Sequence, residues 1–122
     1  MTVLLRLLIV CAGLMGGAGV VLAAMSAHGE NAARLLPASS MLLFHAPAVI
    51  GVVLLAERAL VAPWLGAAAA CGFLAGAALF SGTITLHHFS GHGLFPMAAP
   101  TGGTLMILSW LVLALAGVLP KG

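Results

Sequence analysis

The sequence predicts an all-α integral membrane protein: a single domain over residues 1–122, built as a bundle of four transmembrane helices. Hydrophobic residues make up 63% of the 122 and charged residues only 5%. A soluble domain needs charge on roughly a quarter of its surface residues, so lipid is the solvent that suits this composition. Four stretches also reach the length of roughly 20 apolar residues that a helix needs to cross a bilayer.

The first predicted span covers residues 3–27. Arg6 precedes a long apolar run, a pattern that a secretory signal peptide shares. The run of roughly 24 residues exceeds the apolar core of about 7–15 residues that such peptides have. We therefore interpret it as a retained helix.

The other three spans are bounded by proline, which is tolerated in the first turn of a helix and stops a helix elsewhere. Pro37 precedes the second span, Pro63 begins the third and Pro100 lies at the start of the fourth, which Pro120 ends. The predicted ranges are residues 39–56, 63–86 and 99–119.

The few charged residues predict how the helices are oriented. Arg6, Arg58 and Lys121 fall on one side of a four-span topology, and Arg34 alone falls on the other. Cytoplasmic loops carry the excess of Lys and Arg, so both termini are expected to be cytoplasmic. We expect a multi-pass protein of the inner (plasma) membrane, with residues 28–38 and 87–98 facing the other side.

Small residues at four-residue spacing predict where helices pack closely, because glycine allows two backbones to approach in lipid. The first and third spans each contain such a pair, which favours contact between them, although an alanine-rich chain also produces this spacing by chance. The fourth span begins with two adjacent glycines. The predicted helix-packing residues are Gly13, Gly17, Gly72, Gly76, Gly102 and Gly103.

Polar residues inside the spans are the candidate functional residues, since polar groups in a membrane face the bundle interior or a watery pocket. At 1.5 Å per helical residue, His45 and Ser81 both lie roughly 10 Å below one surface. We expect one polar layer there, and the hypothetical ligand-binding residues are His28, His45, Ser81, Thr101 and Thr104.

These residues also have structural interpretations. A neutral His45 can hydrogen-bond to a neighbouring helix, and His28 can end a helix with Gly29 in a left-handed conformation. The histidines at positions 87, 88 and 92 lie in a predicted Gly-rich loop without a nearby thiolate or carboxylate, so we predict no metal site. Cys11 and Cys71 lie in apolar runs and are read as hydrophobic residues.

No catalytic motif, phosphate-binding glycine loop or haem attachment motif is present, and no Lys/Arg cluster suits nucleic acid. We predict no catalytic residues and no cofactor. Both carboxylates are expected at membrane interfaces, whereas coupled transporters place acids within the membrane.

Four short motifs resemble a known family. They are Ala27-His28-Gly29, Phe44-His45-Ala46, Leu79-Phe80-Ser81-Gly82, and Pro100-Thr101-Gly102-Gly103 followed by Trp110. In this order and spacing the chain resembles, over nearly its whole length, the small four-helix membrane proteins of a domain-of-unknown-function group that includes the bacterial YgdD and YwdK types. The resemblance implies four helices in the inner membrane with both termini inside, and it implies no activity. The chain departs from the pattern at Ser109, where members of the group have glycine.

The leading functional interpretation is a non-enzymatic accessory or interaction subunit, whose partners are membrane lipid and a larger membrane protein complex. The alternative is a binder of a small lipophilic ligand or redox cofactor, such as quinone, lipid or haem, at the polar layer. A small oligomeric transporter ranks last.

Overall fold

The computed structural model describes residues 1–119, and the remaining three, which include Pro120 and Lys121, lie outside the described residues. Its elements are α1 (Val3–Ser26), a short 3₁₀ helix η1 (Ala32–Leu35), α2 (Leu36–Glu57), α3 (Pro63–Ser90) and α4 (Ala98–Val118). Each of the four α-helices is long and apolar enough to cross a membrane. The predicted all-α fold with four spans is confirmed.

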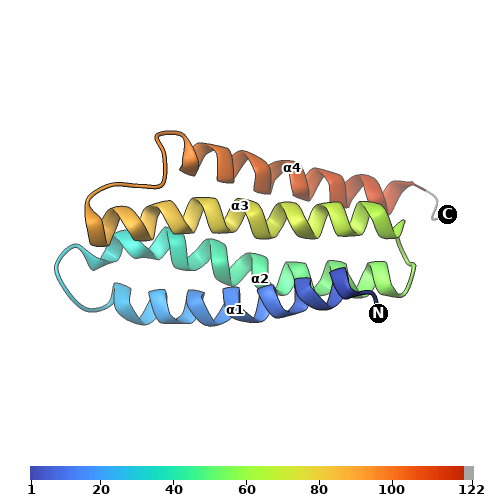
Figure 1. The fold of residues 1–122 in the computed structure, drawn as a ribbon, viewed down its shortest axis with the longest axis horizontal. Coiled ribbons are helices and arrows are strands. Elements are labelled where there is room, and N and C mark those ends of the chain that lie inside the picture. The colour runs from blue at the N-terminus through green and yellow to red at the C-terminus, as the bar shows by residue number, and fades with distance from the viewer. Residues whose placement is uncertain (120–122) are drawn as a thin grey trace.

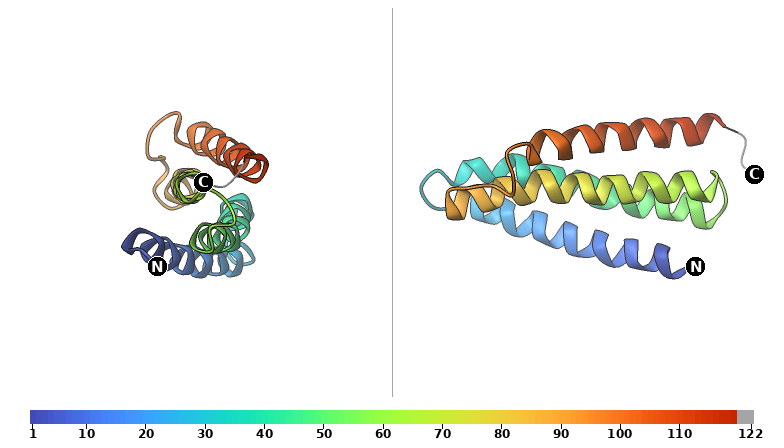
Figure 2. Two further views of the ribbon diagram at one scale, coloured as in Figure 1. Left: turned by 90° about the vertical axis from the view of Figure 1, so that its right-hand side faces the viewer. Right: turned by 45° about the horizontal axis from the view of Figure 1, so that its top comes forward.

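The helices run antiparallel and pack in the order of the chain, α1 on α2, α2 on α3 and α3 on α4 (Figure 1). α1 and α4 lie on opposite sides of the α2–α3 pair, so the four helices form an open, curved layer (Figure 2). We call the end with the N-terminus, the α2–α3 connection and Val118 the terminal end. The opposite end, with residues 27–35 and 91–97, is the loop end.

Two helices extend beyond their predicted bounds by three or more residues. α3 continues past residue 86 to Ser90, because a helix needs no apolar residues once it leaves the hydrocarbon, and it ends where Gly91 takes φ +81°. α2 begins at Leu36 rather than near Ser39, since the 3₁₀ turn leads directly into it. Gly29 has φ +94°, so the left-handed glycine expected after His28 is confirmed.

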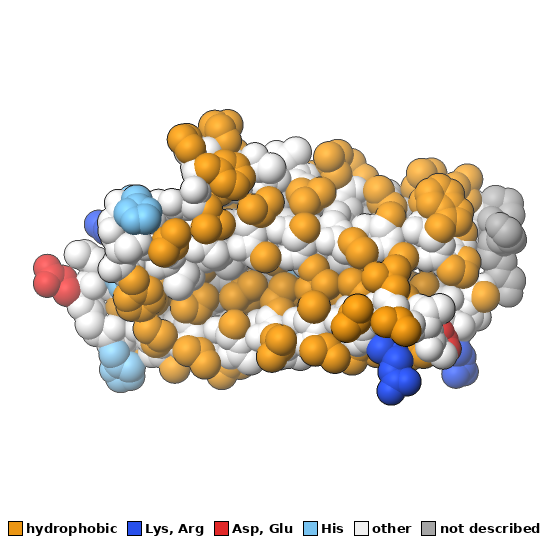
Figure 3. Space-filling model, viewed as in Figure 1, with side chains coloured by type: hydrophobic (Ala, Val, Ile, Leu, Met, Phe, Trp, Pro, Cys, Tyr) orange, Lys and Arg blue, Asp and Glu red, His pale blue; other side chains and the backbone are white. Residues whose placement is uncertain are grey.

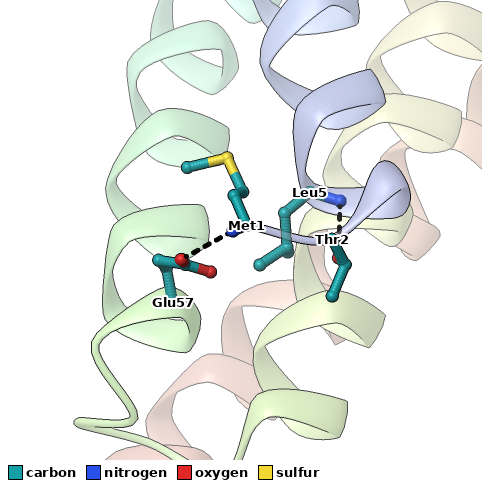
Figure 4. Close-up of polar contacts among 4 residues, drawn as sticks. All are labelled: Met1, Thr2, Leu5 and Glu57. Carbon is teal, nitrogen blue, oxygen red and sulfur yellow. Dashed lines mark hydrogen bonds and ion pairs between the residues drawn. The ribbon is translucent and has the colours of Figure 1, made fainter.

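The start of α1 is fixed at the terminal end. The Leu5 amide donates to Thr2 Oγ1 at 3.2 Å, which satisfies one of the unpaired N–H groups of the first turn. The ammonium group of Met1 lies 3.1 Å from Glu57 Oε1, so the chain start is tied to the last residue of α2 (Figure 4).

The core lies along α2 and α3. Phe73, Val49, Val52 and Val53 are among its fully buried side chains. The outer helices are far more open, and only 22% of the most apolar stretch of α4 is buried, against 44% for α2. Apolar side chains cover the length of the visible face, with charged side chains and histidines near its ends (Figure 3). This distribution is the one that a bilayer requires.

The expected contact between α1 and α3 through their glycines is wrong. A Cβ at Gly13 or Gly17 would meet nothing within 4 Å, and α1 touches α3 only marginally. The glycines of α3 pack against α4 instead. A Cβ at Gly76 would lie 2.7 Å from the Gly102 carbonyl oxygen, and one at Gly102 would lie 2.6 Å from the Gly76 carbonyl oxygen.

Two further predicted packing glycines differ from each other. A Cβ at Gly72 would overlap the Ser109 hydroxyl, so Gly72 is needed where α3 faces this serine. Gly103 has open space around it, because it points away from α3. Close packing therefore requires glycine at positions 72, 76 and 102. At positions 13, 17 and 103 no neighbouring part of the chain requires a glycine.

Candidate functional site

His45 lies buried in the middle of the bundle, and both of its ring nitrogens are engaged. Nδ1 lies 2.7 Å from the Met41 carbonyl oxygen, one turn back in α2. The indole Nε1–H of Trp110 in α4 donates to His45 Nε2 at 3.1 Å. An indole nitrogen only donates, so His45 Nε2 must be the acceptor of this bond. The ring proton is then on Nδ1, which donates to the Met41 carbonyl oxygen. His45 is therefore held as one neutral tautomer.

Aromatic rings enclose this bond. The rings of Phe73 and Trp110 lie 4.5 Å apart, and the imidazole lies 5.4 Å from Phe73 and 5.8 Å from Trp110. His45 is 4% exposed and Phe73 is fully buried, whereas 45% of Trp110 remains exposed on the outside of α4. We call these three residues the central cluster. Its hydrogen bond joins α2 to α4, and Phe73 of α3 packs against both of the bonded rings.

The central cluster leaves little room for ligand chemistry. A haem iron or a metal ion needs a lone pair of an imidazole nitrogen, and a quinone carbonyl needs an N–H donor. The Nε2 lone pair accepts from Trp110, and the Nδ1 proton goes to Met41. Any ligand at His45 would have to break one of these bonds.

Ser81 belongs to a different layer. Its hydroxyl donates to the Ala38 carbonyl oxygen at 2.8 Å, and Ser39 donates to the Gly19 carbonyl oxygen, also at 2.8 Å. These bonds join α3 to α2 and α2 to α1. Ala38 precedes His45 by seven residues, or roughly 10 Å along the helix. We call Ser39 and Ser81 the serine layer.

The single polar layer expected from the sequence is therefore wrong in its composition. His45 and Ser81 are both buried and both bonded across helices, but to different partners. Thr101 and Thr104 are exposed on α4, beside a shallow hollow of about 370 Å³. His28 is exposed after α1, and its backbone amide donates to the Met25 carbonyl oxygen at 3.1 Å. The structure does not bring the five candidates together.

Three residues of the central cluster and the serine layer were not among the predicted site residues. A tryptophan inside a span needs an acceptor for its N–H, which indicates a polar partner for Trp110 but does not identify it. Ser39 is the first residue of the second predicted span, where its position at the predicted helix start hides its contact with α1. Phe73 gives no signal in the sequence, because a single phenylalanine in an apolar run is indistinguishable from any other core residue.

The remaining histidines gather at the loop end. His87 and His88 lie in the last turns of α3 rather than in a loop, and His92 follows the left-handed Gly91. Together with Arg34 they line an open hollow of about 910 Å³. Within residues 1–119, no three His, Cys, Asp or Glu side chains are placed to hold a metal ion together.

Comparison with known proteins gives a family without an assigned activity. No curated protein and no solved structure matches the chain. Residues 22–103 match the family described as "Protein of unknown function (DUF423)". The matched segment runs from the end of α1 into the first turns of α4, and it includes both His45 and Ser81. Because it covers well over half of the sequence, the chain belongs to the DUF423 family.

Proposed function

We propose that this protein is a non-enzymatic accessory or interaction subunit of the inner (plasma) membrane, which packs beside a larger membrane protein complex. The observation that carries the proposal is that the buried polar side-chain atoms of the protein are all hydrogen-bonded within the described residues. This pairing supports a structural role, because the buried polar side chains hydrogen-bond across or within the helices.

The outer helices support the same proposal. α4 contacts the rest of the bundle through one side only, and its exposed side carries Ile107, Leu108, Leu111 and Leu115. The open, curved layer leaves α1 uncovered as well. The exposed sides of α1 and α4 therefore give a larger membrane protein two long apolar surfaces to pack against, and the short loops do not block access to them.

Photo-cross-linking in native membranes tests the subunit proposal. A photoreactive amino acid at Ile107 or Leu111 should cross-link to one discrete larger protein, and the same residue at the buried Val52 should not. Purification in a mild detergent should then retain that partner. Cross-links to lipid alone, with migration of the free chain under every detergent condition, would overturn the proposal.

The proposed topology has both termini and the α2–α3 connection in the cytoplasm, on the basis of Arg6, Arg58 and Lys121. In a variant without Cys11 and Cys71, new cysteines at Glu30 and His92 should react with an impermeant thiol reagent from outside the cell. A cysteine at Leu60 should react only after the membrane is permeabilised. The reverse pattern would invert the topology.

A redox cofactor at the central cluster is the less favoured alternative. It would require His45 to leave Trp110 or Met41. A colourless preparation without iron or co-purified quinone would remove this alternative.

A further inference from the structure

The last turns of α3 are surrounded by adjoining hollows at the loop end. The first is an apolar groove between α1 and α3, of about 750 Å³. Its walls include Ala18 and Val21 of α1 and Gly82, Leu86 and Phe89 of α3. The groove exists because α1 and α3 barely touch. We call it the apolar groove.

The second is the hollow of about 910 Å³ lined by Arg34, His87, His88 and His92, which we call the basic hollow. The loop that forms its wall is fixed in place. The Leu94 amide donates to Thr83 Oγ1 at 3.0 Å, and Gly93 lies so close to Thr83 that a Cβ would overlap the hydroxyl. The basic hollow is therefore a fixed feature of this end of the bundle.

The two hollows are neighbours. Leu94 lines both of them. A third hollow of about 490 Å³ shares His88 with the basic hollow and Phe89 with the apolar groove. Leu94 stands between the two hollows, so they connect around the end of α3 through this third hollow, past His88 and Phe89. A ligand with a polar head and an apolar tail could reach from one compartment to the other by this route.

The positive charge of the basic hollow favours a ligand with an anionic head group. Within residues 1–119, the one ion pair joins Met1 and Glu57 at the terminal end, so Arg34 forms no ion pair with a carboxylate. Glu30, the acid at the loop end, lines the third hollow and not the basic hollow. A guanidinium with neighbouring imidazole donors is suited to phosphate oxygens. Basic residues next to a membrane span attract anionic lipids in the same way.

We propose that the loop end binds one anionic phospholipid, with its phosphate at Arg34 and the three histidines and one acyl chain in the apolar groove. This site is separate from the central cluster, and the proposal does not depend on the subunit function. A free anion would use only the basic hollow, and an uncharged lipid only the apolar groove. The phospholipid is favoured because the two hollows adjoin.

Native mass spectrometry of the full chain in detergent tests the proposal with four probes. Dioleoylphosphatidylglycerol should bind with 1:1 stoichiometry. Dioleoylphosphatidylcholine lacks the net charge, dioleoylglycerol lacks the phosphate and glycerol phosphate lacks the chains, so each should bind at least several-fold more weakly. Equal binding of any of these three would overturn the proposed recognition.

Matched variants locate the site. Arg34→Gln should weaken phosphatidylglycerol binding about fivefold, the effect of one basic residue at an anionic surface. Ala18→Phe fills the apolar groove and should weaken phosphatidylglycerol binding by at least as much. The controls are Arg58→Gln at the terminal end and Gly13→Phe, which projects into open space on the same helix; both should bind as the parent does.

Both test positions are exposed, so the fold should survive, and helix content by circular dichroism should match that of the parent. If Ala18→Phe does misfold, Gly82→Leu fills the groove from the opposite wall. Unchanged phosphatidylglycerol binding in folded Arg34→Gln, or in both groove-filling variants, would overturn the site.

Discussion

The two outer helices are attached to the bundle in different ways. α4 meets α3 backbone to backbone, since a Cβ at Gly76 or Gly102 would strike the carbonyl oxygen of the other glycine. α1 meets α2 through side chains, because a Cβ at Gly19 would lie 2.8 Å from Leu43 Cγ, which belongs to a flexible side chain. Glycine spacing alone does not predict a close crossing: the partner helix must also present a small residue, such as Gly102 or Ser109, at the point of contact.

The largest effect is expected where α4 crosses α3. Gly102→Ala places a methyl group against the Gly76 carbonyl oxygen and the Phe80 amide nitrogen, neither of which can move without shifting a helix. We expect a loss of about 2–3 kcal/mol, as for other overpacked sites. Unfolding by sodium dodecyl sulfate in mixed micelles, followed by circular dichroism, measures it.

Gly103→Ala is the matched control, since its Cβ meets nothing within 4 Å. It should leave stability unchanged or raise it, by at most about 0.5–1 kcal/mol, because alanine is the better helix former. Equal behaviour of the two variants would mean that the helices do not cross at Gly102.

The second attachment of α4 is the Trp110–His45 hydrogen bond between two side chains. The corresponding bond of α1 runs from the Ser39 side chain to the Gly19 backbone carbonyl. His45→Leu should cost about 1 kcal/mol, the upper part of the range for interhelical bonds in membranes, and His45→Gln should cost less because the amide oxygen can accept from Trp110. A double-mutant cycle with Trp110→Phe should give a coupling of about 0.6–1.7 kcal/mol. Zero coupling would show that the bond does not form in the membrane.

The four helices were predictable because apolar length is a local property of the sequence. The ends of the helices were less predictable. α3 continues through the polar His87 and His88 to Ser90, because hydrogen bonding within a helix does not depend on apolar side chains. Helix neighbours depend on tertiary packing, so the Gly13 and Gly17 pair was assigned to a contact that it does not make.

The buried positions of His45 and Ser81 were predictable, since polar residues in spans turn inward. Their partners were not. Whether His45 meets Ser81 or Trp110 depends on the rotation and register of α3 and α4, which no local pattern specifies. The prediction that Thr101 and Thr104 face the bundle interior was wrong for the same reason. Sequence position gives their depth in the membrane but not the side of α4 on which they lie.

A smaller effect is expected at the serine layer, which compares the two sides of α2. Ser39→Ala removes the hydrogen bond to α1, and Ser81→Ala removes the one between α3 and α2. Each should cost about 0.6 kcal/mol, the average for such bonds in a membrane protein. Ser90→Ala is the control, because the exposed Ser90 hydroxyl bonds to Leu86 in its own helix. Losses above about 2 kcal/mol would show that these hydroxyls do more than join neighbouring helices.

The smallest effect, with the opposite sign, is expected on the open face of α1. Gly13→Ala and Gly17→Ala add methyl groups that meet no other part of the chain. Alanine is the better helix former, so each variant should be unchanged or more stable, by at most about 0.5–1 kcal/mol. The same detergent-unfolding measurement, repeated at several protein-to-detergent ratios, provides the test. A loss of stability that grows with protein concentration would mean that a second copy of the chain packs on this face, and α1 would then be held by glycine contacts as α4 is.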